Sequence, residues 1–152
     1  MKIAVLAYDW PGYRGGPIVN ARRLLPELHR RGHTVHALLL YQGAGAPSAE
    51  VLRSEGVVVD TAPFGRWTED RIDWLLACLA RIQPDVFVPN LSVAGWFAAR
   101  WARETGIPTV AAYRSDDAFY AAMVETFVLG EPRWAVSGLV CVNQAACERV
   151  GA

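Results

Sequence analysis

The sequence predicts an α/β fold, a single doubly wound Rossmann-like domain whose parallel sheet of about six strands carries helices on both faces. Short apolar runs alternate with longer segments whose apolar residues recur at helical spacing, which is the pattern of repeated strand–helix units. The first run, KIAVLAY, is almost continuously apolar, as expected of a strand covered on both faces. The 152 residues show no repeat and no compositional boundary, so we expect one domain over residues 1–152.

The expected strands are apolar runs that begin at or soon after the N-terminus, a glycine or a proline. They cover residues 2–8, 33–41, 57–59, 85–89, 107–112 and 138–142. The expected helices cover residues 17–31, 49–54, 68–82, 93–105, 115–128 and the segment after 143. Right-handed crossovers between parallel strands then lead to the doubly wound arrangement.

Polar residues mark where several of these helices are expected to begin. Thr68, Ser92 and Asn143 are predicted helix caps, and Ser115 is predicted to start the helix that follows the fifth strand. Pro26 lies inside the first helical pattern, where it removes a backbone hydrogen bond. It predicts a kink or two shorter helical pieces.

Composition excludes several classes of protein. Fifteen basic and fifteen acidic side chains cancel, so overall charge gives no reason to expect nucleic acid or an anionic membrane as a partner. The N-terminus lacks the apolar core of a signal peptide, and no apolar run approaches the roughly 20 residues of a membrane span. We expect a cytoplasmic protein, for which peripheral membrane contact stays open.

The cysteines give no sign of a metal site. Cys78, Cys141 and Cys147 are an odd number without CxxC spacing, and we interpret them as reduced, buried, small apolar side chains. The histidines also lack the spacing of a metal site. We therefore expect no metal and no cofactor.

The loop after the first strand is the most informative segment. YDWPGYRGGPIV places three glycines where the first strand turns into the first helix. In a doubly wound fold, Asp9–Gly16 and Asn90–Ser92 both leave the carboxyl edge of the sheet and should face one crevice. Gly15 and Gly16 precede the first helix, whose free N–H groups favour an anion.

Two common phosphate-binding motifs are missing from this loop. A dinucleotide fingerprint needs G-x-G-x-x-G and an acidic residue after the second strand, but the second strand here ends in Tyr41-Gln42. The phosphate loop G-x-x-x-x-G-K-[ST] is also absent from the sequence. The loop therefore indicates another kind of site, or glycines that only shape the turn.

A different family carries a longer loop with adjacent glycines. The segment RGGPIVNARRLLPELHRRGHTVHALLL, residues 14–40, resembles the opening of the retaining GT-B glycosyltransferases of the large "group 1/family 4-like" class, with its Gly-Gly loop and RGH.V helix end. The pieces IQPDVFVPN, TGIPTVAAY and VSGLVCVNQAACERV continue in register with it. The resemblance covers nearly the whole chain.

The resemblance implies a function for the chain as an acceptor-side N-terminal domain. A full-length enzyme would transfer a sugar from a nucleotide-sugar donor to an acceptor hydroxyl, with retention of configuration. Gly15 and Gly16 would offer N–H groups to the donor diphosphate, which is the leaving group. In this interpretation the reaction needs no metal.

The sequence departs from the family at the end of the fifth strand. Family members usually have a histidine there, and Arg114 stands at the matching position. Arginine cannot act as a base, but it can pair with a phosphate or a sugar carboxylate, or it can be a surface charge beside the neighbouring aspartates. For Asp116 we expect a contact to an acceptor hydroxyl, whereas Asp117 is expected to complement the helix dipole. Arg114 and Asp116 are the candidate catalytic residues.

Four further residues are candidates for the acceptor side of the crevice. Trp10 and Tyr13 flank the glycine loop, and aromatic faces stack on sugar rings, although such residues also cover core edges. Asn90 and Ser92 follow the fourth strand, where they can form hydrogen bonds in the crevice. Ser92 is equally explained as a helix cap.

A second domain that binds the nucleotide and carries an E-x7-E motif is expected in the family, and it does not fit within 152 residues. We therefore expect that the chain is a truncated N-terminal half, inactive alone, whose partners are a C-terminal domain, a nucleotide-sugar donor and an acceptor. Two alternatives are a stand-alone flavodoxin-like module that binds a nucleotide or small anion, and a non-catalytic interaction domain. The first predicts nucleotide affinity without a second domain, and the second predicts an exposed apolar patch.

Overall fold

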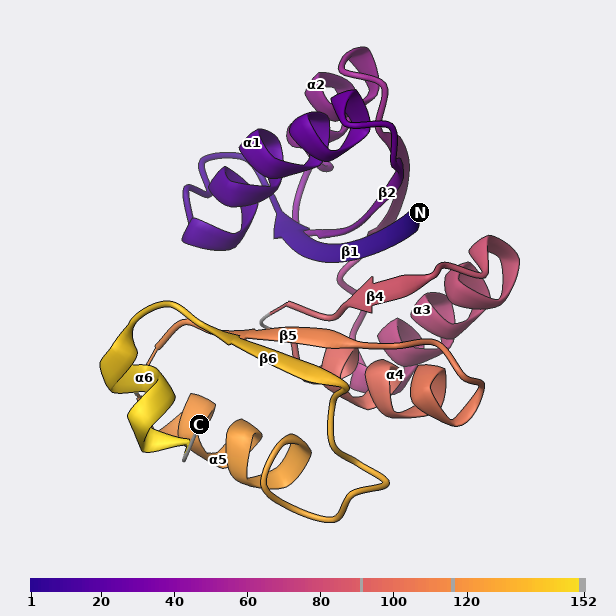
Figure 1. The fold of residues 1–152 in the computed structure, drawn as a ribbon. Coiled ribbons are helices and arrows are strands. Elements are labelled where there is room, and N and C mark those ends of the chain that lie inside the picture. The colour runs from indigo at the N-terminus through magenta and orange to yellow at the C-terminus, as the bar shows by residue number, and fades with distance from the viewer. Residues whose placement is uncertain (91, 116, 151–152) are drawn as a thin grey trace.

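The computed structural model describes residues 1–90, 92–115 and 117–150, and strands and helices alternate along the chain (Figure 1). The strands are β1 (Lys2–Asp9), β2 (Thr34–Tyr41), β3 (Val58–Pro63), β4 (Val86–Val88), β5 (Val110–Tyr113) and β6 (Gly138–Cys141). The helices are α1 (Gly16–Arg30), α2 (Ser48–Ser54), α3 (Thr68–Ile82), α4 (Val93–Glu104), α5 (Ala118–Phe127) and α6 (Gln144–Arg149). The α/β class and all the expected elements are confirmed.

Four parallel strands form the main sheet in the order β3-β2-β1-β4, and β5 pairs with β6 in a separate parallel ladder. A single bridge between Phe87 and Thr109 joins the two, with Phe87 N–H donating to the Pro108 carbonyl at 2.9 Å. The expectation of one sheet of about six strands is therefore corrected to four strands plus two. The next bond along β4 would need an N–H at position 89, and Pro89 has none.

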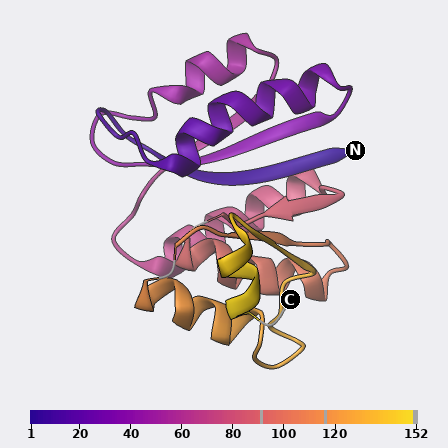
Figure 2. The same ribbon diagram turned by 60° about the vertical axis from the view of Figure 1, so that its left-hand side comes forward.

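The two faces of the main sheet are covered by different helices (Figure 2). Odd-numbered residues of β1 such as Ile3 and Val5 pack with Ile18 and Leu25 of α1 and with α2. Even-numbered residues of β1 and β2 pack with α3 and α4; they include Ala4, Leu6, Leu38 and Leu40. Period-two alternation thus supplies both cores, since the central strands β1 and β2 are buried on both faces.

Three expected helix details are corrected. Pro26 lies within one continuous helix α1, so of the two expected alternatives, a kink or two shorter pieces, the second is wrong. Helix α3 has Trp67 rather than Thr68 at its N-cap, and the Asp70 carboxylate accepts from Trp67 N–H at 3.4 Å. Helix α5 begins after Asp117, not at Ser115, because the Asp117 carboxylate accepts from Tyr120 N–H at 3.0 Å.

The cysteines differ in burial. Cys78 is buried, whereas Cys141 and Cys147 are half-buried, so the expectation of three buried cysteines holds only for the first. Burial raises the pKa of the Cys78 thiol. Among the described residues there is no group of three metal-ligating side chains, and no described helix is long and apolar enough to cross a membrane.

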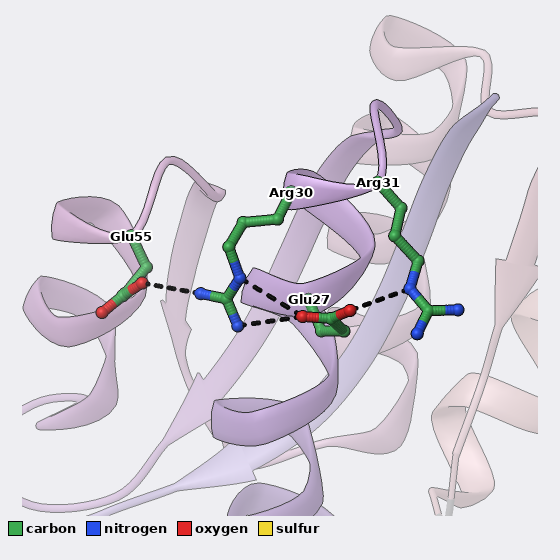
Figure 3. Close-up of polar contacts among 4 residues, drawn as sticks. All are labelled: Glu27, Arg30, Arg31 and Glu55. Carbon is green, nitrogen blue, oxygen red and sulfur yellow. Dashed lines mark hydrogen bonds and ion pairs between the residues drawn. The ribbon is translucent and has the colours of Figure 1, made fainter.

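Ion pairs join the C-terminal end of α1 to the neighbouring helix α2 (Figure 3). The Glu27 carboxylate accepts from Arg30 and Arg31, and Arg30 also pairs with Glu55 at 3.3 Å. These two arginines lower the pKa of Glu27. All four side chains are exposed, so water screens the pairs and they add little to stability.

Helix α4 packs closely against the end of β4 at Gly95, and this contact generates a stability prediction. A Cβ at position 95 would lie 2.5 Å from the Pro89 carbonyl oxygen and 2.7 Å from Leu6 Cδ2. Overpacking of this kind costs about 1–3 kcal/mol, against at most about 1 kcal/mol gained from the helix propensity of alanine. We predict that Gly95→Ala lowers the free energy of unfolding in urea. Gly138→Ala is the control because its nearest neighbour is 3.9 Å away, and equal effects from the two changes would contradict the contact.

The half-buried His36 of β2 predicts a pH dependence. Burial lowers its pKa below the ordinary 6.5, although Asp60 opposes the shift, and its Nδ1 has no partner among the described residues. The unfolded chain takes up a proton here near pH 6.5 and the folded chain only at lower pH, so the free energy of unfolding falls as the pH drops through 6.5. His36→Leu should make this decline shallower in urea unfolding between about pH 7 and pH 5. An unchanged slope would show that His36 does not contribute.

Candidate functional site

A pocket lies at the carboxyl end of β1, where the loops that follow β1 and β4 run in opposite directions. Strand β2 pairs with one side of β1 and β4 with the other, so the loops after β1 and β4 part at the carboxyl edge. The switch-point pocket has a volume of about 160 Å³. Its lining residues are Leu6, Ala7, Tyr8, Tyr13, Pro17, Asn90, Ser92 and Tyr120.

Asn90 is the buried polar residue at the base of this pocket. Its backbone is left-handed, with φ 51°, and its side chain is 5% exposed. Asparagine tolerates this conformation better than most residues. The amide Nδ2 donates to the Leu6 carbonyl at 3.1 Å, while Oδ1 is buried without a partner among the described residues. A hydrogen-bond donor on a ligand would satisfy that oxygen.

Ser92 and Tyr8 form the second polar group of the pocket. The Tyr8 hydroxyl donates to Ser92 Oγ at 2.5 Å, and Ser92 Oγ also accepts from Gly95 N–H at 3.2 Å. The predicted cap at Ser92 is thus confirmed. Burial raises the pKa of Tyr8 above its ordinary value of 10.0, against the opposing effect of the Ser92 bond. The phenol therefore stays protonated at neutral pH.

The glycine loop is shaped by two stacked aromatic rings. Tyr13 N–H donates to the Trp10 carbonyl at 3.0 Å, and the two ring centroids lie 3.9 Å apart with 24° between the planes. Gly12 has a φ of 80° in this turn. A Cβ on Gly15 would overlap the Tyr13 phenol ring, whereas a Cβ on Gly16 would meet nothing within 4 Å. Gly15 is thus required by the Tyr13 ring, while the start of α1 at Gly16 is open.

An outer hollow of about 290 Å³ lies on the other side of Tyr13. Its lining residues are Trp10, Gly12, Tyr13, Arg14, Ile18, Val19, Arg22 and Pro47. Below it, the buried Asp9 carboxylate accepts from Ser48 N–H at 2.6 Å, and Ser48 Oγ accepts from Arg22 Nε at 2.7 Å. These bonds fix the end of β1 to the start of α2, so Asp9 has a structural role.

The structure brings some predicted site residues together and separates others. Tyr13, Asn90 and Ser92 line the switch-point pocket, whereas Trp10 lines the outer hollow. Gly15 and Gly16 lie between Tyr13 and Pro17 of the pocket wall.

The residues after β5 are a separate group. Arg114 is half-buried, and its Nε has no partner among the described residues. Asp116 lies outside the described residues. The Asp117 side chain caps α5, and its bonds to Tyr120 N–H and to the Ser115 hydroxyl lower its pKa.

Sequence reasoning missed Tyr8 and Tyr120 as pocket residues. Tyr8 is the penultimate residue of β1, and its place at the carboxyl end of an otherwise apolar strand was a usable signal. Tyr120 lies in the first turn of α5, where no sequence pattern indicates which way the helix approaches β1. The burial of Tyr120 raises its pKa, and the nearby Asp117 adds to the effect.

A larger hollow lies elsewhere among the described residues. It measures about 560 Å³ between α3 and α4, and its wall includes Leu76, Leu79, Trp101 and Ile107. Gln83, Pro84 and Thr105, which precede β4 and β5, also line it. This hollow is therefore at the amino edge of the sheet, away from the edge where ligands of such folds bind.

The fold is a Rossmann-like domain with a pocket at the switch point of the sheet, and the family and structural matches make it one of the GT-B type. The chain matches the model of Glycosyltransferase Family 4 over residues 14–150, and it belongs to that family. No curated protein matches the chain. The family resemblance noted in the sequence is thereby confirmed.

Solved structures share the fold at low sequence identity. A putative UDP-N-acetylglucosamine 2-epimerase from Listeria monocytogenes has a TM-score of 0.68 and 9% identity, over 98% of this chain and 41% of that one. MurG from Acinetobacter baumannii has a TM-score of 0.59 and 12% identity, over 92% of this chain and 45% of that one. UDP-GlcNAc 2-epimerase from Neisseria meningitidis, bound to UDP-GlcNAc, has a TM-score of 0.55 and 15% identity, over 80% of this chain and 34% of that one. The chain thus spans less than half the length of these proteins.

The shared hydrogen bond between Tyr8 and Ser92 generates a prediction about local stability. Ser92→Ala removes both the cap of α4 and the acceptor for Tyr8, and the lost cap alone costs about 1 kcal/mol. Tyr8→Phe keeps the cap, so it should lower the free energy of unfolding by less than Ser92→Ala does. Urea unfolding of the two variants measures the difference. The cap has no energetic role if Ser92→Ala is as stable as the unaltered chain.

Proposed function

We propose that this chain is the acceptor-side domain of a nucleotide-sugar-dependent glycosyltransferase. The enzyme transfers a sugar to an acceptor hydroxyl, with retention of configuration. The observation that supports this most is the adjacency of an open helix start and a polar pocket. Pro17 lines the pocket, and the preceding Gly16 has free space beside it. Membership of Glycosyltransferase Family 4 agrees with the proposal.

The donor diphosphate is proposed to lie at the start of α1. This helix has Gly15 at its N-cap without a side-chain cap bond. Pro17 has no N–H, so the N–H groups of Gly16 and Ile18 are those of the first turn proposed to meet an anion. Negative charge grows on the diphosphate as the bond to the sugar breaks. N–H groups aimed at that charge stabilise the transition state more than the ground state.

The acceptor is proposed to lie in the switch-point pocket beside Tyr13, Asn90 and Ser92, with Trp10 at the outer end of the stacked rings. Arginine side chains do not act as bases and pair well with anionic groups, so the proposed role of Arg114 is to hold a phosphate or sugar group in place. Asp116 is proposed to contact the acceptor hydroxyl. UDP-GlcNAc in the Neisseria meningitidis epimerase supports a nucleotide sugar as donor.

The remaining parts of the enzyme are also proposals. A second domain is proposed to bind the nucleotide and to close over the carboxyl edge, which excludes water from the reaction. Residues 1–152 alone would then not transfer sugar. We further propose a cytoplasmic enzyme.

The two adjacent glycines should respond differently to alanine, which tests the proposed diphosphate contact. Gly16→Ala places a methyl group in the open space beside the helix start, so kcat/KM for the nucleotide sugar should fall about 10-fold to 100-fold in the full protein. Its effect on unfolding should stay within about 1 kcal/mol, because better helix propensity is opposed by the restriction before Pro17. Coupled detection of released nucleoside diphosphate measures the rate.

Gly138→Ala is the matched control, since position 138 begins β6 at the opposite edge and has room for a methyl group. It should leave the rate unchanged. Gly15→Ala is less informative because it also displaces the Tyr13 ring. Unchanged kcat/KM in Gly16→Ala would contradict the proposed contact.

A further inference from the structure

We infer that the switch-point pocket takes an alcohol hydroxyl of an uncharged polyhydroxylated compound, a neutral sugar or polyol, and selects against acids and amines. This inference rests on the proposed function, in which that compound is the acceptor. It names the chemical class of the acceptor from the hydrogen-bonding groups that line the pocket.

Asn90 contributes a hydrogen-bond acceptor, its Oδ1, to which no described group donates. Its Nδ2 is committed to the Leu6 carbonyl at 3.1 Å, which fixes the amide orientation because the reverse would set two oxygens against each other. The other amide atom, Oδ1, is therefore the one left without a partner among the described residues. Asn90 is 5% exposed and lines the pocket. An unpaired oxygen at this depth costs free energy until a donor reaches it.

Tyr8 and Ser92 contribute a donor. The two hydroxyls share one hydrogen bond of 2.5 Å, and Gly95 N–H donates to Ser92 Oγ. Two hydroxyl groups carry two protons and their shared bond uses one, so one O–H proton remains whichever way the bond points. Burial raises the pKa of Tyr8, which keeps that proton in place at neutral pH.

An unpaired acceptor and a spare donor that line the same pocket match a ligand group that both donates and accepts, as an alcohol hydroxyl does. An alcohol hydroxyl can donate to Asn90 Oδ1 and accept from the Tyr8–Ser92 pair at the same time. An ammonium can only donate, so it leaves the hydroxyl proton unused. A carboxylate or phosphate oxygen can only accept, and it would face the Asn90 oxygen without a proton between them.

The rest of the wall agrees with a neutral ring. Among the described residues, the eight that line the pocket carry no charge, and three of them, Tyr8, Tyr13 and Tyr120, are aromatic. Aromatic faces cover the C–H faces of a sugar while leaving its hydroxyls to polar groups. The volume of about 160 Å³ is below the roughly 300–1,000 Å³ of sites for drug-sized ligands. It suits one ring rather than a chain of rings.

Binding of matched sugars to the full protein tests the inference without any turnover. The probes are D-glucose with D-glucuronate, D-galactose with D-galacturonate, and D-glucosamine, each titrated at neutral pH and followed by saturation-transfer NMR. We expect at least one neutral sugar to bind at least about 10-fold more tightly than its acid and than the amine, because the charged groups leave buried polar atoms unpaired. The inference is overturned if an acid or the amine binds as tightly as the neutral sugars, or if no neutral sugar binds.

Variants of the pocket assign the binding to the residues named above. Asn90→Gly retains the positive φ but removes the amide, and it should weaken neutral-sugar binding at least about 10-fold. Tyr8→Phe removes the phenol hydroxyl and leaves the Ser92 O–H without the partner that orients it, so it should weaken binding severalfold while leaving the fold intact. Tyr41→Phe is the matched control, because it removes a phenol hydroxyl at the end of β2, outside the pocket. Equal binding by Tyr8→Phe and Tyr41→Phe would overturn the inference even if Asn90→Gly failed to fold.

A parallel assay separates failure of this inference from failure of the proposed function. The full protein is incubated with a panel of nucleotide sugars and each of the five probes, and released nucleoside diphosphate is measured. Turnover with acids or the amine in preference to neutral sugars would overturn the acceptor class and leave the transferase proposal standing. Selective binding of neutral sugars without turnover of any nucleotide sugar would support the proposed ligand class and overturn the transferase proposal.

Discussion

The hydrogen bond from Asn90 Nδ2 to the Leu6 carbonyl is the interaction on which the site depends. It joins the end of β4 to β1 beside Pro89, which has no N–H to continue the pairing with β5, and where Asn90 turns into the left-handed region. The same turn brings Ser92 to the start of α4, and Gly95 lets that helix approach the Pro89 carbonyl. The pocket is thus formed by the backbone that ends the main sheet.

Stability and function make opposite demands on this turn. A left-handed non-glycine residue and a buried oxygen without a partner both cost free energy, and the surrounding core offsets that cost through two apolar clusters on the faces of the sheet. Strain held in a well-packed frame is a common feature of binding sites. The aromatic stack of Trp10 and Tyr13 adds rigidity on the other side of the pocket, so the site is largely formed before any ligand arrives.

Local sequence signals predicted the elements well, because period-two and helical patterns report burial directly. They were weaker where contacts between distant segments determine where a helix begins or a sheet ends. Asp117 rather than Ser115 caps α5, and the sheet breaks after β4 because of one missing N–H at Pro89. Asn90 and Ser92 were predictable from their place after a strand. The partnership of Ser92 with Tyr8, the contribution of Tyr120 and the ring of Tyr13 over Gly15 were not, since they depend on how distant segments approach each other.

The most direct test of the central claim is hydrogen–deuterium exchange in the full protein, with and without a nucleotide sugar and a neutral sugar. The claim that ligands bind at the carboxyl edge predicts slower exchange in two segments, residues 10–19 around the start of α1 and residues 88–95 around Asn90. Amide exchange in the parts of α3 and α4 that line the hollow between them should not change. Protection confined to α3 and α4, with no change in the two segments at the carboxyl edge, would contradict the account.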